Sequence, residues 1–245
     1  MKKEYYAIMR FQKHKIGDLS KLERHHEKRE TLKHRANPHL EKYNKHFKRN
    51  NTTLLKNVKN IVKEQEKRTN KKVRKDANVI VEFVFTFSPE AEGSFDIYEW
   101  DKQNKKFLFD MFGKENILRY DIEFDEATPH VHAFVCPRNS ENNICFKSYV
   151  SNKHDIEDMQ TDYAKLMKPF GLKRGKPKNL TKAFHKPISQ FYLEEQKKAE
   201  QQANDIINRA IAEADEMIKK AIAEREKYLK ECHEIAENVF DDLEL

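Results

Sequence analysis

Residues 117–135 read ILRYDIEFDEATPHVHAFV, two apolar segments joined by a short polar connection. The segments 117–124 and 130–135 are rich in Ile, Val, Phe and Tyr, which favour strands, whereas the DEATP between them is typical of a turn. The stretch therefore predicts a β-hairpin. Asp125 and Glu126 lie in its turn, and Pro129 stiffens the start of the second strand.

Two histidines stand at alternate positions of the second predicted strand. Residues two apart in a strand project from the same face, so His130 and His132 present their imidazoles side by side. Two such rings hold a divalent ion at about 2.0–2.2 Å when a neighbouring strand supplies a third ligand. Hairpin pairing brings Glu123 opposite them, so we expect a metal site of Glu123, His130 and His132. The alternative is a pair of half-buried strand histidines bonded to the backbone.

Further elements surround the hairpin. Residues 78–88, NVIVEFVFTFS, predict a central strand whose lone carboxylate, Glu82, either turns to an edge or faces a site. Residues 5–13 predict an opening strand, and an amphipathic helix is expected after Thr52 or Thr53. Further helices are expected before Gly113 and Gly171. The predicted fold class is α/β (α+β), with a central antiparallel sheet that carries the metal site and helices on its outer side.

The chain changes character near residue 194, after which it contains no Gly or Pro. Apolar residues such as Ile207, Ile211 and Ile218 recur there at spacings of four and three, with one polar break at Arg225. This pattern predicts a long helix able to form a coiled coil, and a single solvated helix is the alternative. We therefore predict a globular domain that carries the metal site over residues 1–192 and a helical, coiled-coil-like tail over residues 193–245.

Charge is distributed unevenly along the 245 residues. Residues 1–75 contain 24 Lys and Arg against 8 Asp and Glu, together with six of the eleven histidines. A surface of that sign attracts nucleic acid, although a solvated basic helix would show the same composition. The three cysteines have no CxxC spacing and are expected to be packing residues. Without a long apolar run or a signal-like start, we expect a cytoplasmic protein.

The segment DEATPHVH (residues 125–132) resembles the His-hydrophobic-His motif of the HUH endonucleases, in the form found in MobV-type plasmid mobilisation relaxases, the plasmid recombination (Pre/Mob) enzymes. Residues 5–19, 71–90 and 170–192 are similar to this family's opening strand, its basic turn with the central strand, and its connector. The resemblance covers residues 5–192.

This resemblance implies a metal-dependent relaxase that nicks one DNA strand at a plasmid origin of transfer and stays joined to the 5′ phosphate. Its nucleophile would be a histidine in the segment RHHEKRE (residues 24–30), where His26 with Arg29 fits best and His25 is the competitor. Arg29 would hold the phosphate, and Glu126 would orient the nucleophile or a ligand.

The chain departs from the family at one ligand, because Glu123 stands where members commonly have a histidine. A carboxylate shifts the preference toward harder ions, so Mn²⁺ or Mg²⁺ is favoured as cofactor. Plasmid DNA is the expected partner, and the tail is expected to join a second copy or another protein. The expected DNA-contacting residues are basic and lie in three segments: Arg24, His25, Lys72, Arg74, Lys75, Lys173, Arg174 and Lys176.

Three other functions remain open. Tyr5, Tyr6 or Tyr43 would be the nucleophile of a tyrosine-type HUH replication or transposition nuclease, although we interpret all three as packing residues. A non-catalytic DNA-binding protein with a structural metal would bind without nicking. A metal-dependent hydrolase would use water and form no covalent adduct.

Overall fold

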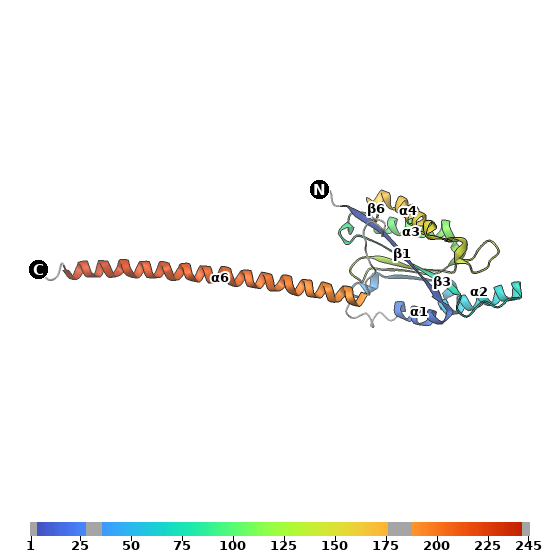
Figure 1. The fold of residues 1–245 in the computed structure, drawn as a ribbon, viewed down its shortest axis with the longest axis horizontal. Helices are drawn as coiled ribbons and strands as arrows, with labels where there is room; N and C mark the ends of the chain where they lie inside the picture. Colours follow the sequence, from blue (N-terminus) through green and yellow to red (C-terminus); the bar gives the residue numbers. More distant parts are fainter. Residues whose placement is uncertain (1–3, 28–35, 176–187, 242–245) are drawn as a thin grey trace. The chain divides into compact units, whose positions relative to one another are not determined.

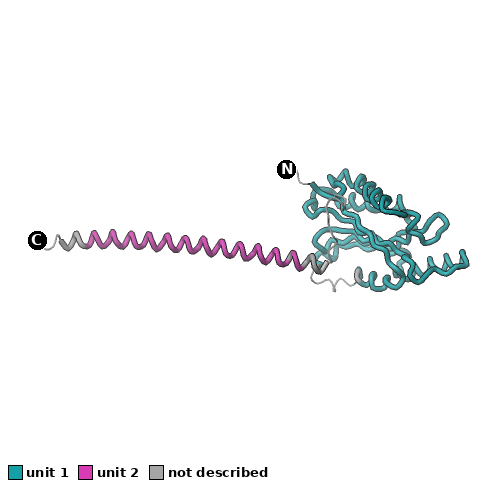
Figure 2. The backbone as a smooth tube through the Cα atoms, in the orientation of Figure 1, with its two compact units in different colours: residues 1–177 teal, residues 178–245 magenta. Residues whose placement is uncertain are grey.

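The structure is a computed structural model that describes residues 4–27, 36–175 and 188–241. The chain divides into two compact units, residues 1–177 and 178–245 (Figure 2). The second unit consists mainly of one helix, α6 (Ile188–Asp241). The predicted boundary between residues 192 and 193 lies inside α6 and stays a prediction. None of the helices in the described ranges is both long and apolar enough to cross a membrane.

Unit 1 is built on a six-stranded sheet of order β2-β4-β5-β3-β1-β6. Its strands are β1 (Tyr5–Lys15), β2 (Lys45–Lys48), β3 (Asn78–Phe87), β4 (Ile117–Glu123), β5 (His130–Val135) and β6 (Leu172–Arg174). Neighbours pair antiparallel except β1 and β6, which run parallel. The predicted α/β class and the predicted central position of β3 are confirmed.

Helices cover both faces of the sheet rather than one outer side (Figure 1). On one face lie α1 (Leu19–Glu27) and α2 (Leu54–Thr69), and on the other lie α3 (Ile97–Phe112) and α4 (Lys153–Met167). The predicted cap of α2 is confirmed, because the Thr53 side chain accepts a hydrogen bond from the backbone N–H of Lys56. Gly113 ends α3 with a φ of 81°, a conformation that glycine adopts without strain.

Each face of the sheet has its own apolar core. The odd-numbered residues of β5 and those of β3 from Val81 onward, among them Phe83 and Val131, pack in the larger core beneath α3 and α4. Even-numbered residues such as Ile80 and Phe134 form a smaller core with Leu19 of α1 and with α2. Apart from Val84, the rest of the α1 face of β3, β4 and β5 carries polar side chains. The alternation of strand side chains therefore separates the packing face from the polar face.

One packing prediction for a single residue is wrong. Cys136 is buried as expected, whereas Cys232 is exposed on α6 in the single chain, and its packing depends on the untested coiled coil. Tyr5 packs against the larger core as expected, whereas Tyr43, in the short 3-10 helix Glu41–Tyr43, is more than half exposed. In α6 the apolar residues of the predicted seam are exposed in the single chain, so the coiled coil stays a prediction.

Candidate metal centre and catalytic site

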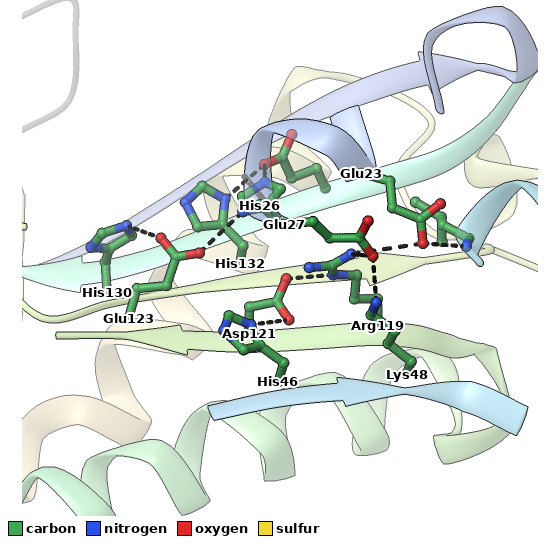
Figure 3. Close-up of polar contacts among 12 residues, drawn as sticks. Glu23, His26, Glu27, His46, Lys48, Arg119, Asp121, Glu123, His130 and His132 are labelled. Carbon is green, nitrogen blue, oxygen red and sulfur yellow. Dashed lines mark hydrogen bonds and ion pairs between the residues drawn. The ribbon is translucent and has the colours of Figure 1, made fainter. Parts of the chain in front are cut away.

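The pairing of β4 with β5 places the expected metal ligands on one face of the sheet. Glu123 pairs with His130 and Asp121 pairs with His132, so these four side chains project toward α1. Figure 3 shows them gathered beneath that helix. The hairpin predicted from the sequence therefore brings its carboxylates and imidazoles together, as strand alternation requires.

The three expected ligands meet closely. One ligand atom from each of Glu123, His130 and His132 lies within 4.8 Å of the others. The Oε2 of Glu123 is 3.2 Å from the Nε2 of His130. Two ligands of one tetrahedral ion at bond lengths of about 2.1 Å would lie about 3.4 Å apart. The cluster thus has dimensions that fit a divalent cation.

Second hydrogen bonds fix both histidine rings. Nδ1 of His132 donates to Oε1 of Glu82 at 2.7 Å, and Nδ1 of His130 donates to the carbonyl of Thr128 at 3.0 Å. Histidine ligands of metals usually donate their other ring N–H to a carboxylate or a backbone carbonyl, which sets the tautomer. In both residues Nε2 is therefore the nitrogen left to bind an ion.

Glu82 faces the site, which settles the alternative left open by the sequence. It lies on β3, and its Oε2 accepts a hydrogen bond from Nε2 of His14, on β1, at 2.8 Å. Burial opposes its charge, but the hydrogen bonds from His132, His14 and His26 hold the pKa of Glu82 well below its ordinary value. Glu82 is therefore an anion that orients histidines on both sides of it.

His26 brings α1 into the cluster. Its ring is 2% exposed, and its Nδ1 donates to Oε1 of Glu123 at 3.1 Å. The centroids of the His26 and His132 rings are 4.4 Å apart. Burial opposes protonation, yet hydrogen bonds to Glu123 and Glu82 raise the pKa of His26 to about 9. His26 also forms two further three-residue groups with metal-ligand spacing, one with Glu82 and His132 and one with Asp121 and Glu123.

The two expected metal histidines respond differently to their surroundings. Burial lowers the pKa of His132 despite its hydrogen bond to Glu82. Burial also opposes protonation of His130, but the Glu123 carboxylate outweighs it and raises the pKa of His130, with a smaller contribution from Glu126. The pKa of Glu123 is held well below its ordinary value against its burial, by hydrogen bonds from His130 and His26. The lowered pKa of His132 favours its neutral form, and that of Glu123 favours its ionised form. These are the forms in which imidazole and carboxylate bind a metal cation.

A buried arginine joins α1 to the sheet next to this cluster (Figure 3). Arg119, on β4, is 1% exposed and donates from Nε to Oδ2 of Asp121 at 2.6 Å. Its Nη1 lies 3.7 Å from Glu23 and 3.5 Å from Glu27, both on α1. Glu23 also accepts a hydrogen bond from the backbone N–H of Leu54, at the start of α2. Arg119 thus holds the helix that carries His26.

Other predicted site residues lie apart or outside the described part of the chain. Arg29 and Lys176 lie outside the described residues, as does the side chain of His25. Glu126 is half-buried in the β4–β5 connection. The remaining predicted DNA contacts are exposed or half-buried and occupy α1, the turn between α2 and β3, and β6 at one edge of the sheet: Arg24, Lys72, Arg74, Lys75, Lys173 and Arg174.

Sequence reasoning missed His14, Asp121 and Arg119. Asp121 had a usable signal, because it stands two residues before Glu123 in a predicted strand and so shares its face. His14 and Arg119 had none, since their roles depend on the register of β1 with β3 and on the packing of α1.

Comparison with known proteins supports one family. The family model "Plasmid recombination enzyme" (Mob_Pre) matches residues 3–193. A plasmid recombination enzyme of Bacillus thuringiensis is 27% identical over 175 residues, and the alignment covers 69% of this chain and 39% of the relative. A 65 kDa protein of Zymomonas mobilis subsp. mobilis is 29% identical over 191 residues, which covers 76% of this chain and 32% of the relative. The chain thus spans about a third of the length of these relatives.

The fold has a counterpart among solved structures. The Mn-bound MobM relaxase domain (MOBV; Mob_Pre), in complex with plasmid pMV158 oriT DNA, superposes with a TM-score of 0.66. It is 26% identical, and the match covers 76% of this chain and 98% of that domain. Since the family model spans more than half of the chain, the protein belongs to the plasmid recombination enzyme (Mob_Pre) family.

Proposed function

We propose that this protein is a relaxase that nicks one strand of plasmid DNA at an origin of transfer, with a divalent metal ion, and stays attached to the 5′ phosphate through a histidine of α1. The observation that carries the proposal is the convergence of Glu123, His130 and His132 within 4.8 Å of one another, directly beneath His26. The likeness to a Mn-bound, oriT-bound relaxase domain supports the same assignment.

The ion would be held by Glu123 and by Nε2 of His130 and of His132, the nitrogens left open by the hydrogen bonds at Nδ1. A bound divalent ion supplies Lewis-acid polarisation of the scissile phosphate. Because Glu123 is a carboxylate, Mn²⁺ or Mg²⁺ is favoured in this role. Glu82 keeps His132 in the orientation that such binding needs.

His26 is the proposed nucleophile, and its neighbour His25 is the alternative. His26 meets the requirement of proximity, because its ring lies against His132 and its Nδ1 is fixed by Glu123. With its Nδ1 proton held by Glu123, the ring would attack phosphorus through Nε2 after giving up the Nε2 proton that its raised pKa implies. The N–P bond of a phosphoramidate would form as the bond from phosphorus to the 3′ oxygen breaks, and the 3′ oxygen would take up a proton. Its 2% exposure means that DNA binding must uncover Nε2. If His26 instead remains buried as a positioning residue, His25 takes the covalent role. Glu126 and Arg29 are proposed to assist by hydrogen bonding and by holding the phosphate.

The test incubates the full chain and Mn²⁺ with supercoiled plasmid that carries the candidate origin region. Denaturing gels before and after protease treatment reveal a strand whose 5′ end carries protein. The variants are His26→Ala, His25→Ala and His130→Ala, and His154→Ala, an exposed histidine of α4, is the matched control. The proposal expects an adduct in wild type and control, its loss in His130→Ala, and its loss in one of the two α1 variants.

Each departure points to a different function. An adduct that survives in both α1 variants would contradict a histidine nucleophile and favour a tyrosine. Nicks with free 5′ phosphates and no adduct would indicate a hydrolase. DNA that is bound but left intact with every divalent ion tested would indicate a non-catalytic DNA-binding protein.

A further inference from the structure

A hollow lies at the β2 edge of the sheet, apart from the metal centre. It has a volume of about 480 Å³, within the usual range of ligand pockets. Phe47 of β2 and Tyr98 and Phe109 of α3 contribute aromatic rings, and Tyr120 and Ile122 of β4 contribute apolar surface. None of these five residues belongs to the cluster around His26.

The hollow and the metal centre lie on opposite faces of β4, the strand that they share. In β4, Asp121 and Glu123 face α1, whereas Tyr120 and Ile122 pack on the side of α3. In β2, His46 pairs with Asp121, and its Nδ1 donates to Oδ1 of that residue at 2.9 Å. The adjacent positions Lys45 and Phe47 therefore point to the other face. β2 is the edge strand of the sheet. A DNA strand leaving the metal centre would therefore reach the hollow by passing around the β2 edge.

Two of the aromatic rings in the hollow are open to solvent. Phe47 is 48% exposed and Tyr98 is 56% exposed, although both are large apolar side chains. Cations stand over ring faces in the same place: Nζ of Lys45 is 5.0 Å from the Tyr98 centroid, and Cζ of Arg49 is 5.9 Å from the Phe47 centroid. Exposed rings interleaved with cations are what surfaces that bind single-stranded nucleic acid use.

The charge of the hollow is strongly unbalanced. Its single acidic group, Asp101, accepts hydrogen bonds from the Tyr120 hydroxyl and from Nζ of Lys105, both at 2.5 Å. Lys102 also forms an ion pair with Glu99, so the positive charge of the lining that has no printed carboxylate partner among the described residues comes from Lys45, Arg49 and Lys114. The basic side chains that line it are Lys45, Arg49, Lys102, Lys105 and Lys114.

We infer that the hollow between β2 and α3 binds single-stranded DNA, with a base stacked on Phe47 or Tyr98 and the flanking phosphates against Lys45 and Arg49. The inference rests on the proposed function, which brings a DNA strand to the adjoining face. An acidic peptide would satisfy the cations but has no flat ring to cover the two exposed aromatic faces. A single strand uses both features, because each nucleotide carries a phosphate and a π face.

Binding is measured by fluorescence anisotropy of labelled oligothymidine with the full chain in EDTA, so that cleavage plays no part. Tyr98→Ala and Phe47→Ala are each expected to weaken binding roughly tenfold, the scale of one lost base stack. Lys45→Gln is expected to reduce the slope of log affinity against log salt by about 0.7, one phosphate contact. Tyr228→Ala, at a tyrosine of α6 that is 65% exposed, is the control and should bind as wild type.

Photo-crosslinking locates the contact directly. An oligonucleotide that carries iodouracil should crosslink to peptides from residues 45–49 or 97–112, and mass spectrometry identifies them. Wild-type affinity in both aromatic variants, with crosslinks elsewhere, would overturn the inference and leave the proposed function intact. Failure of wild type to bind any oligonucleotide would overturn both. If a labelled polyglutamate peptide, and not DNA, loses affinity in the variants, the hollow belongs to a protein partner and the inference is wrong.

Discussion

Replacement of Arg119 by methionine should destabilise unit 1 by roughly 3 kcal/mol. Methionine keeps much of the side chain's length and removes its charge, which leaves Asp121 and Glu23 buried without their cation. Breaking a buried ion pair from one side costs about 3–5 kcal/mol. The lower end applies because Asp121 keeps His46 at 2.9 Å and Glu23 keeps the N–H of Leu54 at 2.8 Å.

The assay is urea unfolding followed by the fluorescence of Trp100. This is the only tryptophan in the chain, and it is fully buried in α3, so it reports on unit 1 and not on the long helix α6. With an m-value of about 1–3 kcal/mol per molar urea, the midpoint should fall by roughly 1–3 M. Lys106→Met is the matched control, because Lys106 forms an exposed pair with Asp110 and such pairs contribute at most about 1 kcal/mol.

A midpoint for Arg119→Met no lower than that of Lys106→Met would refute the reasoning. It would mean that the three carboxylates around the guanidinium are as stable without it. Other contacts of α1, such as the packing of Leu19 and the hydrogen bond from His26 to Glu123, would then suffice to hold the helix on the sheet. A large loss of stability with normal metal binding, in contrast, would agree with the structural role assigned to Arg119.

The remaining predictions concern the ion, the thiols and the tail. Mn²⁺ at a hundredfold excess over its dissociation constant should raise the unfolding free energy by about 2.7 kcal/mol, and His132→Ala should abolish this increase in the same urea assay. Glu123→His should raise the affinity for Zn²⁺ relative to Mn²⁺ by about tenfold or more in calorimetric titrations, since imidazole suits the softer ion; an unchanged ratio would argue against Glu123 as a ligand. Iodoacetamide at pH 8 should label Cys232 quickly and Cys136 only after unfolding, because burial raises the pKa of the Cys136 thiol to about 12; peptide mapping checks this. If the tail pairs as a coiled coil, Ile211→Asp should shift the sedimentation coefficient toward the monomer value, and a concentration-independent wild type would contradict the pairing.

The parts of the fold that the sequence predicts well are those with local signals. Residues 78–88 are apolar almost throughout, and the 117–135 stretch carries both strand composition and a turn, so β3, β4 and β5 follow from composition and spacing. The strands β2 and β6 have only four and three residues, and each contains at least two basic side chains. Their composition therefore does not distinguish them from a charged loop. They exist because neighbouring strands offer hydrogen-bonding edges.

The site divides in the same way. Glu123, His130 and His132 are predictable because two of them share a strand and the third lies across one hairpin. Glu82 is conspicuous as a lone carboxylate in an apolar strand, yet only the register of β3 with β5 shows that it meets His132. The approach of His26 to Glu123 joins residues 97 positions apart, and no local pattern encodes it.

The alternation of β4 and β5 has a consequence for how reliably the protein folds. The same strands supply core side chains on one face and polar ligands on the other, so a slip of one residue would bury histidines beneath α3 and turn valines toward α1. No ion could bind such a misaligned sheet, because its donors would be dispersed. Metal binding by this hairpin would therefore select molecules whose strands have the correct register. The fraction of molecules that retain the ion in the presence of a chelator would measure how much of a preparation is correctly folded.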